Sequence, residues 1–390
     1  MVTLLYYSPI SWPHLEARPP SFPHSNELFS ASKGVALYRD SLDLFRLAED
    51  VGFDWLGVGE EHMNAYGVVP NPCLIAAALA FVTERAQLCV MGNPLPLLSP
   101  LRVAEEYAMI DVLSNGRLVA GFPRGVPQNY AAYGVSYETS RDRLSEGIEL
   151  VLKAWRHPGP FNWDGKEYQF NNVSIWPQPT KSPDIILSSR SPESVSLAVQ
   201  HRAIMGEVYV QSRDVLTGFI ANAQRYTTEA MSHGWRASSD RFLLSVPCVI
   251  ARTSGTAMSR ALASTEYART ILSGSFEQGK LALAASADQK VQPSPKRKVE
   301  SLEERIEYGG VICGDPDEVI DQIGRLQAAT GVGVLGLQMQ WANLTSVEVR
   351  ESLQLFGKYV RANVSEHGAA GNAAGRDVVD NGLSEVARFK

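Results

Sequence analysis

The stretch GFDWLGVGEEH, residues 52–62, begins as an apolar strand and ends in two carboxylates and a histidine. Three later stretches repeat this pattern of an apolar run that ends in polar or glycine residues, namely AQLCVMGN (86–93), GRLVAGFPRG (116–125) and DIILSSRSPES (184–194). Helical patterns separate the four runs, and repeated β-α units place the carboxyl ends of all strands at one edge of a parallel sheet. We therefore expect one face to carry Glu60, Glu61, His62, Asn93, Arg124, Arg190 and Ser191.

The remaining chain continues the alternation of strands and helices. Further strands are predicted at residues 4–7, near 206–210, at 242–250 and at 332–337. Helices are predicted at residues 35–51, 72–83, 100–113, 139–155, 212–233 and 346–360, and from Pro192 and Asp315 onward. Eight βα units predict a TIM (β/α)8 barrel, an α/β fold in which chemistry is built at the carboxyl ends of the strands. A chain of 390 residues fits one such barrel with insertions, so we predict a single domain over residues 1–364.

Four segments interrupt the alternation. Residues 8–33 form a long connection on the active face, rich in proline, histidine and aromatic residues, and we expect either a pocket cover or a flexible arm. Residues 161–170 carry Asp-Gly between aromatic residues, which predicts a β-hairpin. Residues 273–308 are predicted to be a mobile insertion, and residues 365–390 a flexible tail.

Composition and charge narrow the class of protein. The chain is 45% hydrophobic and 20% charged, which is typical of a soluble globular protein, and its net charge of −6 argues against nucleic-acid and anionic-membrane partners. It shows no apolar stretch long enough to cross a bilayer and no signal-peptide pattern, so we expect a cytoplasmic protein. The four cysteines lie far apart without metal-ligand spacing, which predicts buried thiols.

Two neighbouring strand ends carry groups that bind anions. In Arg190-Ser191-Pro192-Glu193-Ser194 a strand turns into a helix, so free N–H groups and two hydroxyls could hold a phosphate. Taken alone, the stretch reads better as an ordinary serine N-cap before proline. Arg124, between glycine residues at the neighbouring strand end, could contact the same phosphate with its forked guanidinium. The two elements together favour a phosphorylated cofactor.

The strand end at Glu60, Glu61 and His62 offers titratable groups. A histidine beside carboxylates suits proton transfer near neutral pH, and the alternative interpretation is a structural hydrogen-bond network. A metal is disfavoured, because three consecutive strand residues cannot all point at one ion.

Two neighbouring segments are expected to be mainly structural. In the helix at 100–113, Arg102, Glu105 and Glu106 predict intrahelical ion pairs or a subunit contact, and Asp111 is placed to hold a neighbouring loop. Gly92-Asn93-Pro94 predicts a strained or cis peptide at a strand mouth.

Several short motifs follow one another in order along the chain. They are Ala48-Glu49-x-x-Gly52-Phe53-Asp54, Glu60-x-His62, Asn71-Pro72, Pro100-x-Arg102-x-Ala104-Glu105-Glu106, Asp111-x-Leu113-Ser114-x-Gly116-Arg117, Arg124-Gly125, Pro177-x-Pro179 and Gly314-Asp315-Pro316 with Leu353-x-Leu355-Phe356-Gly357. This ordered set resembles the bacterial luciferase-like family of flavin-dependent monooxygenases, which fold as TIM barrels. The resemblance covers roughly residues 1–364.

The resemblance implies that the barrel mouth binds reduced FMN (FMNH2). Its phosphate would meet Arg124, Ser191 and Ser194, with Arg190 contributing backbone or charge, and Asn93 would lie near the flavin edge. Glu61 and His62 would be the catalytic residues that tune proton transfer. Several family members carry a catalytic histidine at the position of Glu61, so this chain departs from the family there. A non-proline cis peptide at Met91-Gly92 or the next bond is also implied.

The implied activity is monooxygenation of a small organic substrate. A separate flavin reductase would supply FMNH2, O2 would be held as a C4a-(hydro)peroxyflavin, and the protein would be a homodimer. Trp12, Phe22, Tyr66 and Trp341 as pocket walls predict an apolar or aromatic substrate. No G-x-G-x-x-G fingerprint for a nicotinamide cofactor is present. Two alternatives stay open: hydride transfer with the deazaflavin F420 on the same fold, and a non-catalytic flavin-binding protein.

Overall fold

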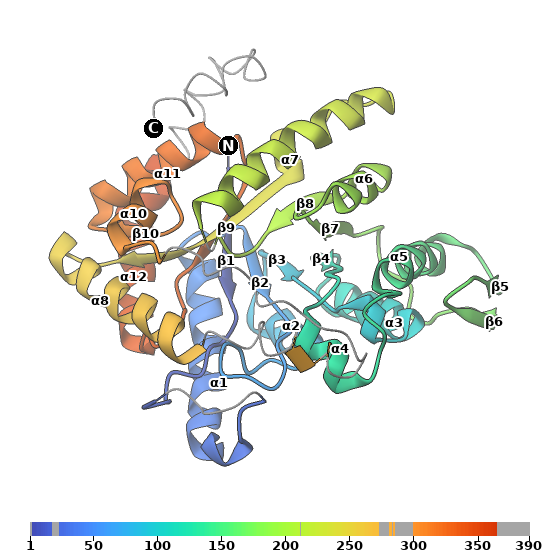
Figure 1. The fold of residues 1–390 in the computed structure, drawn as a ribbon, viewed down its shortest axis with the longest axis horizontal. Helices are drawn as coiled ribbons and strands as arrows, with labels where there is room; N and C mark the ends of the chain where they lie inside the picture. Colours follow the sequence, from blue (N-terminus) through green and yellow to red (C-terminus); the bar gives the residue numbers. More distant parts are fainter. Residues whose placement is uncertain are drawn as a thin grey trace.

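Eight parallel strands close into a barrel (Figure 1). The computed structural model describes residues 2–17, 23–210, 212–272, 281–282, 284 and 299–364. The barrel strands are β1 Thr3–Ser8, β2 Trp55–Val58, β3 Gln87–Val90, β4 Leu118–Gly121, β7 Asp184–Ser188, β8 Ile204–Glu207, β9 Phe242–Ile250 and β11 Val334–Gln338. They pair in this order, and β11 pairs with β1 to close the ring. The predicted TIM barrel in a single α/β domain is confirmed.

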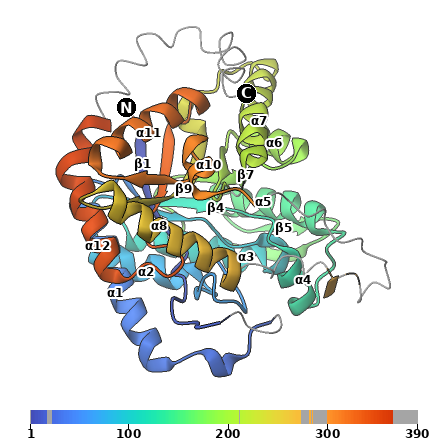
Figure 2. The same ribbon diagram turned by 60° about the vertical axis from the view of Figure 1, so that its left-hand side comes forward.

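Helices surround the barrel on its outside (Figure 2). They are α1 Ala31–Asp50, α2 Pro72–Val82, α3 Pro100–Leu113, α4 Pro127–Tyr133, α5 Ser140–Arg156, α6 Pro192–Gln200, α7 Arg213–Ser232, α8 Ser254–Tyr267, α10 Leu302–Glu307, α11 Pro316–Thr330 and α12 Ser346–Leu355, with short 3-10 or π turns at Asn26–Leu28, Leu95–Leu97, Ser239–Arg241, Ala268–Leu272 and Phe356–Val360. Sequence signals explain their ends: Asp315 and Glu318 form a capping box before α11, and Gly331 ends that helix in the left-handed conformation. Within the described ranges, no helix combines the length and apolarity that a membrane span requires.

The strands separate two hydrophobic cores because successive side chains point to opposite faces. The barrel interior is filled by Leu5, Tyr7, Cys89, Met91, Val119, Ile186, Ile204, Leu243 and Val334. Outward residues such as Leu4, Leu56 and Leu88 pack against the helix layer. All four cysteines are buried and unpaired, as the sequence predicted. The interior core ends just below the loops at the carboxyl ends of the strands, which therefore form the mouth of the barrel.

The insertions attach to this frame in different ways. The predicted hairpin forms from β5 Phe161–Asp164 and β6 Gln169–Val173, and the Glu146 carboxylate of α5 ties it down by accepting from Glu167 N and Tyr168 N at 2.8 and 2.9 Å. A short strand that the sequence did not predict, β10 Ile312–Gly314, pairs with the end of β9 beyond the barrel. Most of the insertion predicted at residues 273–308 and the whole tail predicted at 365–390 lie outside the described residues.

Two predictions about local structure have different outcomes. Asp111 holds a neighbouring loop as expected, because its Oδ2 accepts from the backbone N and the Oγ1 of Thr180, both at 2.7 Å. The cis peptide expected at Met91-Gly92 or at the next bond is wrong, since the cis bond within the described part of the chain is Trp176-Pro177. Close packing explains the glycine there instead: Gly92 has φ +155°, and a Cβ on it would lie 1.9 Å from Gly121 O.

Candidate functional site

Two connections pack together over the barrel mouth. In the first half of the predicted 8–33 connection, Trp12 N donates to Ala65 O at 2.9 Å, and Ser11 Oγ donates to Tyr66 O at 2.6 Å. The Trp12 ring is buried against Phe29. This half of the connection is therefore anchored on the β2–α2 loop. Residues 18–22, including the predicted wall residue Phe22, lie outside the described residues.

Glu61 lies in the β2–α2 loop, partly buried at the mouth. Its N–H donates to Val69 O at 2.9 Å, and its Oε2 accepts from Asn64 Nδ2 at 3.3 Å. It forms no ion pair with the residues that the structure describes. Burial raises the pKa of Glu61 to about 7, although Asn64 and His62 act in the opposite direction. Near neutral pH this carboxyl group can therefore either accept or donate a proton.

His62 is held in a network rather than aimed alone at the mouth. Its Nε2 lies 2.6 Å from Glu60 Oε1, and both side chains are buried. Its Nδ1 lies 3.2 Å from the Tyr133 hydroxyl of α4. Burial raises the pKa of Glu60, and His62 opposes that shift. The two carboxylates of this strand end therefore differ: Glu60 holds the histidine, and Glu61 has no charged partner within the described residues.

Aromatic side chains form a row across the mouth. Ring centroids of Tyr66 and Tyr209 lie 6.4 Å apart, and those of Tyr209 and Trp341 lie 6.3 Å apart. Tyr7 lies below the row, with its ring in the barrel interior. Of the wall residues predicted from sequence, Tyr66 and Trp341 belong to this row, whereas Trp12 belongs to the contact between the two loops. The sequence reasoning missed Tyr7, which reads as an ordinary core residue of a strand.

A cation-rich corner lies where β4 and β7, which are neighbours in the barrel, run into their loops. Ser191 caps α6: its Oγ accepts from Ser194 N at 3.3 Å, and the two hydroxyls are 3.0 Å apart. Arg124 stacks on Tyr137, with its guanidinium carbon 4.8 Å from the ring centroid, and donates to the Tyr137 hydroxyl.

Arg141 on the first turn of α5 is a second arginine at this corner. Its Nη1 lies 2.7 Å from Glu193 Oε2, and this contact lowers the pKa of Glu193 to about 2. The negative charge next to Ser191 is therefore balanced, and the corner has the donor set of a phosphate site. The sequence reasoning missed Arg141, although its place at the start of a helix that follows β4 is a usable signal.

Arg190 and Asn93 are engaged by the protein itself. The Arg190 guanidinium donates to the buried Glu207 carboxylate through Nε at 2.9 Å and Nη2 at 2.7 Å. Asn93 is 2% exposed, and its Oδ1 accepts from the thiol of Cys73 on α2 at 3.6 Å. Its backbone N–H donates to the Tyr107 hydroxyl at 3.0 Å, so both the side chain and the N–H group of Asn93 are engaged within the protein.

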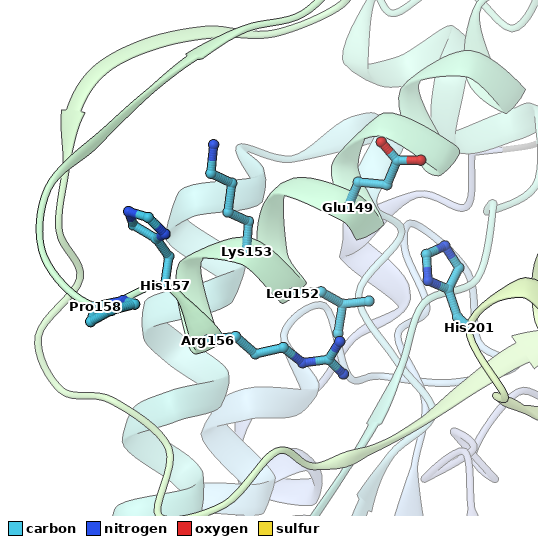
Figure 3. Close-up of a pocket in the computed structure, with 7 residues that line it drawn as sticks. All are labelled: Glu149, Leu152, Lys153, Arg156, His157, Pro158 and His201. Carbon is cyan, nitrogen blue, oxygen red and sulfur yellow. The ribbon is translucent and has the colours of Figure 1, made fainter.

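A separate hollow lies at the opposite end of the barrel, between the carboxyl ends of α5 and α6 (Figure 3). Its lining residues are Glu149, Leu152, Lys153, Arg156, His157, Pro158 and His201. Arg156 extends toward His201, and burial together with that charge lowers the pKa of His201. Lys153 lies over the Phe161 ring, 4.5 Å from its centroid. Basic residues at a helix C-terminus complement the helix dipole, which accounts for this cluster without a ligand.

Comparison with known proteins identifies the family of this chain. The family model for luciferase-like monooxygenases matches residues 21–332. The oxygenase component of a flavin-dependent trigonelline monooxygenase from Acinetobacter baylyi is 30% identical over 191 residues, which cover 46% of this chain and 51% of that protein. The chain thus spans about half the length of this relative. The 4-hydroxyprotoasukamycin monooxygenase of Streptomyces nodosus subsp. asukaensis is 25% identical over 335 residues, 84% of this chain and 86% of that protein.

Solved structures show the same fold. Monooxygenase RslO1 from Streptomyces bottropensis superposes with a TM-score of 0.73 at 23% identity, over 92% of this chain and 99% of that one. The FMN complex of the oxygenating constituent of 3,6-diketocamphane monooxygenase from Pseudomonas putida gives 0.70 at 20% identity, over 92% and 98%. An F420-dependent secondary alcohol dehydrogenase gives 0.65 at 16% identity, over 93% and 99%. At these identities the likeness concerns the fold alone.

Proposed function

Because the chain belongs to the luciferase-like monooxygenase family, we propose that it uses reduced FMN and O2 to oxygenate a small apolar or aromatic molecule. A separate flavin reductase supplies the reduced FMN. The name of the Acinetobacter relative, an oxygenase component, supports this division of labour.

One observation carries the proposal: a corner rich in hydrogen-bond donors and a titratable carboxyl group lie at the same end of the barrel. Arg124, Arg141 and the hydroxyls of Ser191 and Ser194 would hold the FMN phosphate. Arg190 would shape the turn into α6 rather than bind the phosphate by its charge, because its guanidinium is held by Glu207 and its N–H donates to Ser188 Oγ at 3.4 Å. Arg141 offsets the charge of Glu193, whereas Arg124 has no acidic partner among the described residues, so the corner keeps a net positive charge beside the N-terminus of α6, which suits an anionic phosphate.

The residues at the mouth then have defined tasks. Bound reduced FMN supplies the electrons with which O2 is activated. Glu61 accepts or donates the proton that the oxygenation requires, and the Glu60–His62 pair fixes the geometry of the loop that carries it. The aromatic row and the anchored first half of the 8–33 connection keep water away from the reacting atoms.

We further propose a homodimer through α2 and α3, which lie side by side on the barrel surface. Their outer face exposes Leu74 by 70%, Phe81 by 76% and Met109 by 54%. Exposed apolar residues gathered on one face are typical of an interface. Arg85 and Glu105 give the rim charges of both signs, so the face can pair with a second copy of itself.

An anaerobic binding experiment tests the choice of cofactor. The full chain is titrated with reduced FMN and, separately, with reduced F420. We expect reduced FMN to bind at least tenfold more tightly. Tighter binding of reduced F420 would replace monooxygenation by hydride transfer, and no binding of either would refute the proposal. With a flavin reductase, NADH and ¹⁸O2, a panel of aromatic compounds should then yield a product that contains one ¹⁸O atom, which a flavin-sequestering protein would not form.

A further inference from the structure

Two tyrosine hydroxyls at the barrel mouth have no hydrogen-bond partner among the described residues. The ring of Tyr7 is packed in the barrel interior, and the residue is 5% exposed. A Cβ on Gly59 would lie 2.5 Å from Tyr7 Oη, so this hydroxyl lies against the strand end that carries Glu60 and Glu61. The Tyr66 hydroxyl is also unpartnered within the described ranges, and burial, Tyr7, Tyr209 and Glu61 raise its pKa.

Three buried tyrosines elsewhere in this protein donate to backbone carbonyl groups. Tyr107 donates to Gly121 O at 2.8 Å, Tyr226 to Ala203 O at 2.6 Å and Tyr267 to Trp12 O at 2.8 Å. Buried polar groups in proteins are nearly always paired in this way. The Tyr6 hydroxyl also lacks a partner within the described residues, but it is enclosed in the core between the strands and the helices. The hydroxyls of Tyr7 and Tyr66 are not enclosed in this way, so as free donors at the mouth of the barrel they are placed to meet a ligand.

The Glu61 carboxyl group is close enough to both hydroxyls for its charge to raise the pKa of Tyr7 and that of Tyr66. A Cβ on Gly67, the residue after Tyr66, would lie 2.8 Å from Glu61 Cγ. Glycine at positions 59 and 67 thus lets Tyr7 and Glu61 approach the loop backbone. One Glu61 oxygen accepts from Asn64, and the other has no hydrogen bond within the described part of the chain. Two free donors and one free acceptor consequently share one small region.

We propose that Tyr7, Tyr66 and Glu61 bind an acidic hydroxyl group of the substrate, a phenol or an enol. The inference rests on the proposed function, which makes this mouth the site of oxygenation. The O–H bond of the substrate breaks, the proton passes to a Glu61 oxygen, and the electron pair stays on the substrate oxygen. The hydroxyls of Tyr7 and Tyr66 donate to that oxyanion. Ionisation enriches the adjoining carbon atoms in electrons, which prepares them to receive an oxygen atom.

The surrounding charges are compatible with this step. Glu60 and His62 on the same loop are paired with each other, and Arg190 from the β7–α6 turn is paired with Glu207. Glu61 is thus the one of these groups without an ion-pair partner. Burial places its pKa at about 7, close to that of an activated phenol, so little free energy is needed to move the proton.

The test compares two ligands that differ in one hydroxyl group, 4-nitrophenol and 4-nitroanisole. Both are titrated by calorimetry at pH 7 into the FMN-saturated full chain. We expect 4-nitrophenol to bind at least tenfold more tightly. Tyr7→Phe and Tyr66→Phe should each reduce this preference about 2- to 10-fold, the effect of one lost hydrogen bond, with 4-nitroanisole unaffected. Tyr359→Phe, on the surface, is the control and should change neither affinity.

The proton transfer has its own readout. In difference spectra, bound 4-nitrophenol should absorb as the phenolate in the wild type and as the neutral phenol in Glu61→Gln. Equal affinities of the two ligands in the wild type, or an unchanged preference in both tyrosine variants, would overturn the inference. A phenolate spectrum retained in Glu61→Gln would overturn the role of Glu61. These failures with FMN still bound leave the proposed function standing, whereas failure to bind FMN refutes that function itself.

Discussion

Replacing Glu61 by glutamine should stabilise the protein at alkaline pH. The folded state holds the Glu61 proton more tightly than the unfolded chain, because burial raises the pKa from 4.5 to about 7. Stability is therefore lost as the pH rises through this interval. At 1.36 kcal/mol per pKa unit, the wild type should lose about 2.5 kcal/mol between pH 5 and pH 8.5 through this group, and Glu61→Gln should not.

Thermal unfolding at several pH values measures the effect. With an unfolding entropy of about 2.1 cal/mol/K per residue, 2.5 kcal/mol corresponds to about 3 °C in Tm for a chain of this length. The Tm of Glu61→Gln should therefore rise relative to the wild type by about 3 °C between pH 5 and pH 8.5. Glu138→Gln, which changes an exposed carboxylate near the same face, should show no such rise. If the Tm difference between Glu61→Gln and the wild type is the same at both pH values, burial does not raise the pKa of Glu61.

Two further predictions concern the surface and the loop. Phe81→Glu should convert the dimer into a monomer in sedimentation experiments, whereas Val347→Glu on α12, equally exposed at 78%, should not; a dimer that survives Phe81→Glu would place the interface elsewhere. Trp12→Ala should remove about 3–5 kcal/mol of the packing free energy that holds the first half of the 8–33 connection on the β2–α2 loop. The released connection should let more hydrogen peroxide form per NADH in the reductase-coupled assay. An unchanged yield of peroxide would show that this connection does not cover the pocket.

The architecture could be predicted because each element carries its own local signal. Apolar runs of four or five residues, proline at the first turn of α2, α3 and α6, and the Asp-Gly hairpin are all readable in sequence. The pairing of β10 with the far end of β9 could not be predicted from sequence, because it joins segments more than 60 residues apart and β10 is only three residues long. The short helix α4 could not be predicted either, and neither could the contact of its Tyr133 hydroxyl with His62, a residue 71 positions earlier in the chain.

The site was only partly predictable for a related reason. Strand ends place Glu61, Arg124 and Ser191 on one face, which the sequence alone indicates. The side-chain partners that decide their roles come from other elements, such as Glu207 for Arg190 and Cys73 for Asn93. Hydrophobic periodicity predicts which face of a strand is buried. It does not predict whether the hydroxyl of a buried tyrosine has a hydrogen-bond partner.

The proposed FMN site depends on the corner between β4 and β7, where we expect the phosphate to bind. The most direct measurement is the ratio of the affinities for FMN and riboflavin, obtained by flavin fluorescence titration of the wild type, Arg124→Ala and the control Arg156→Ala at the opposite end of the barrel. A charge-assisted hydrogen bond contributes about 1.5–3 kcal/mol, so Arg124→Ala should lower the preference for FMN about 10- to 100-fold and leave riboflavin binding unchanged. Arg156→Ala should behave like the wild type. Equal losses for FMN and riboflavin in Arg124→Ala would show that Arg124 does not contact the phosphate of FMN.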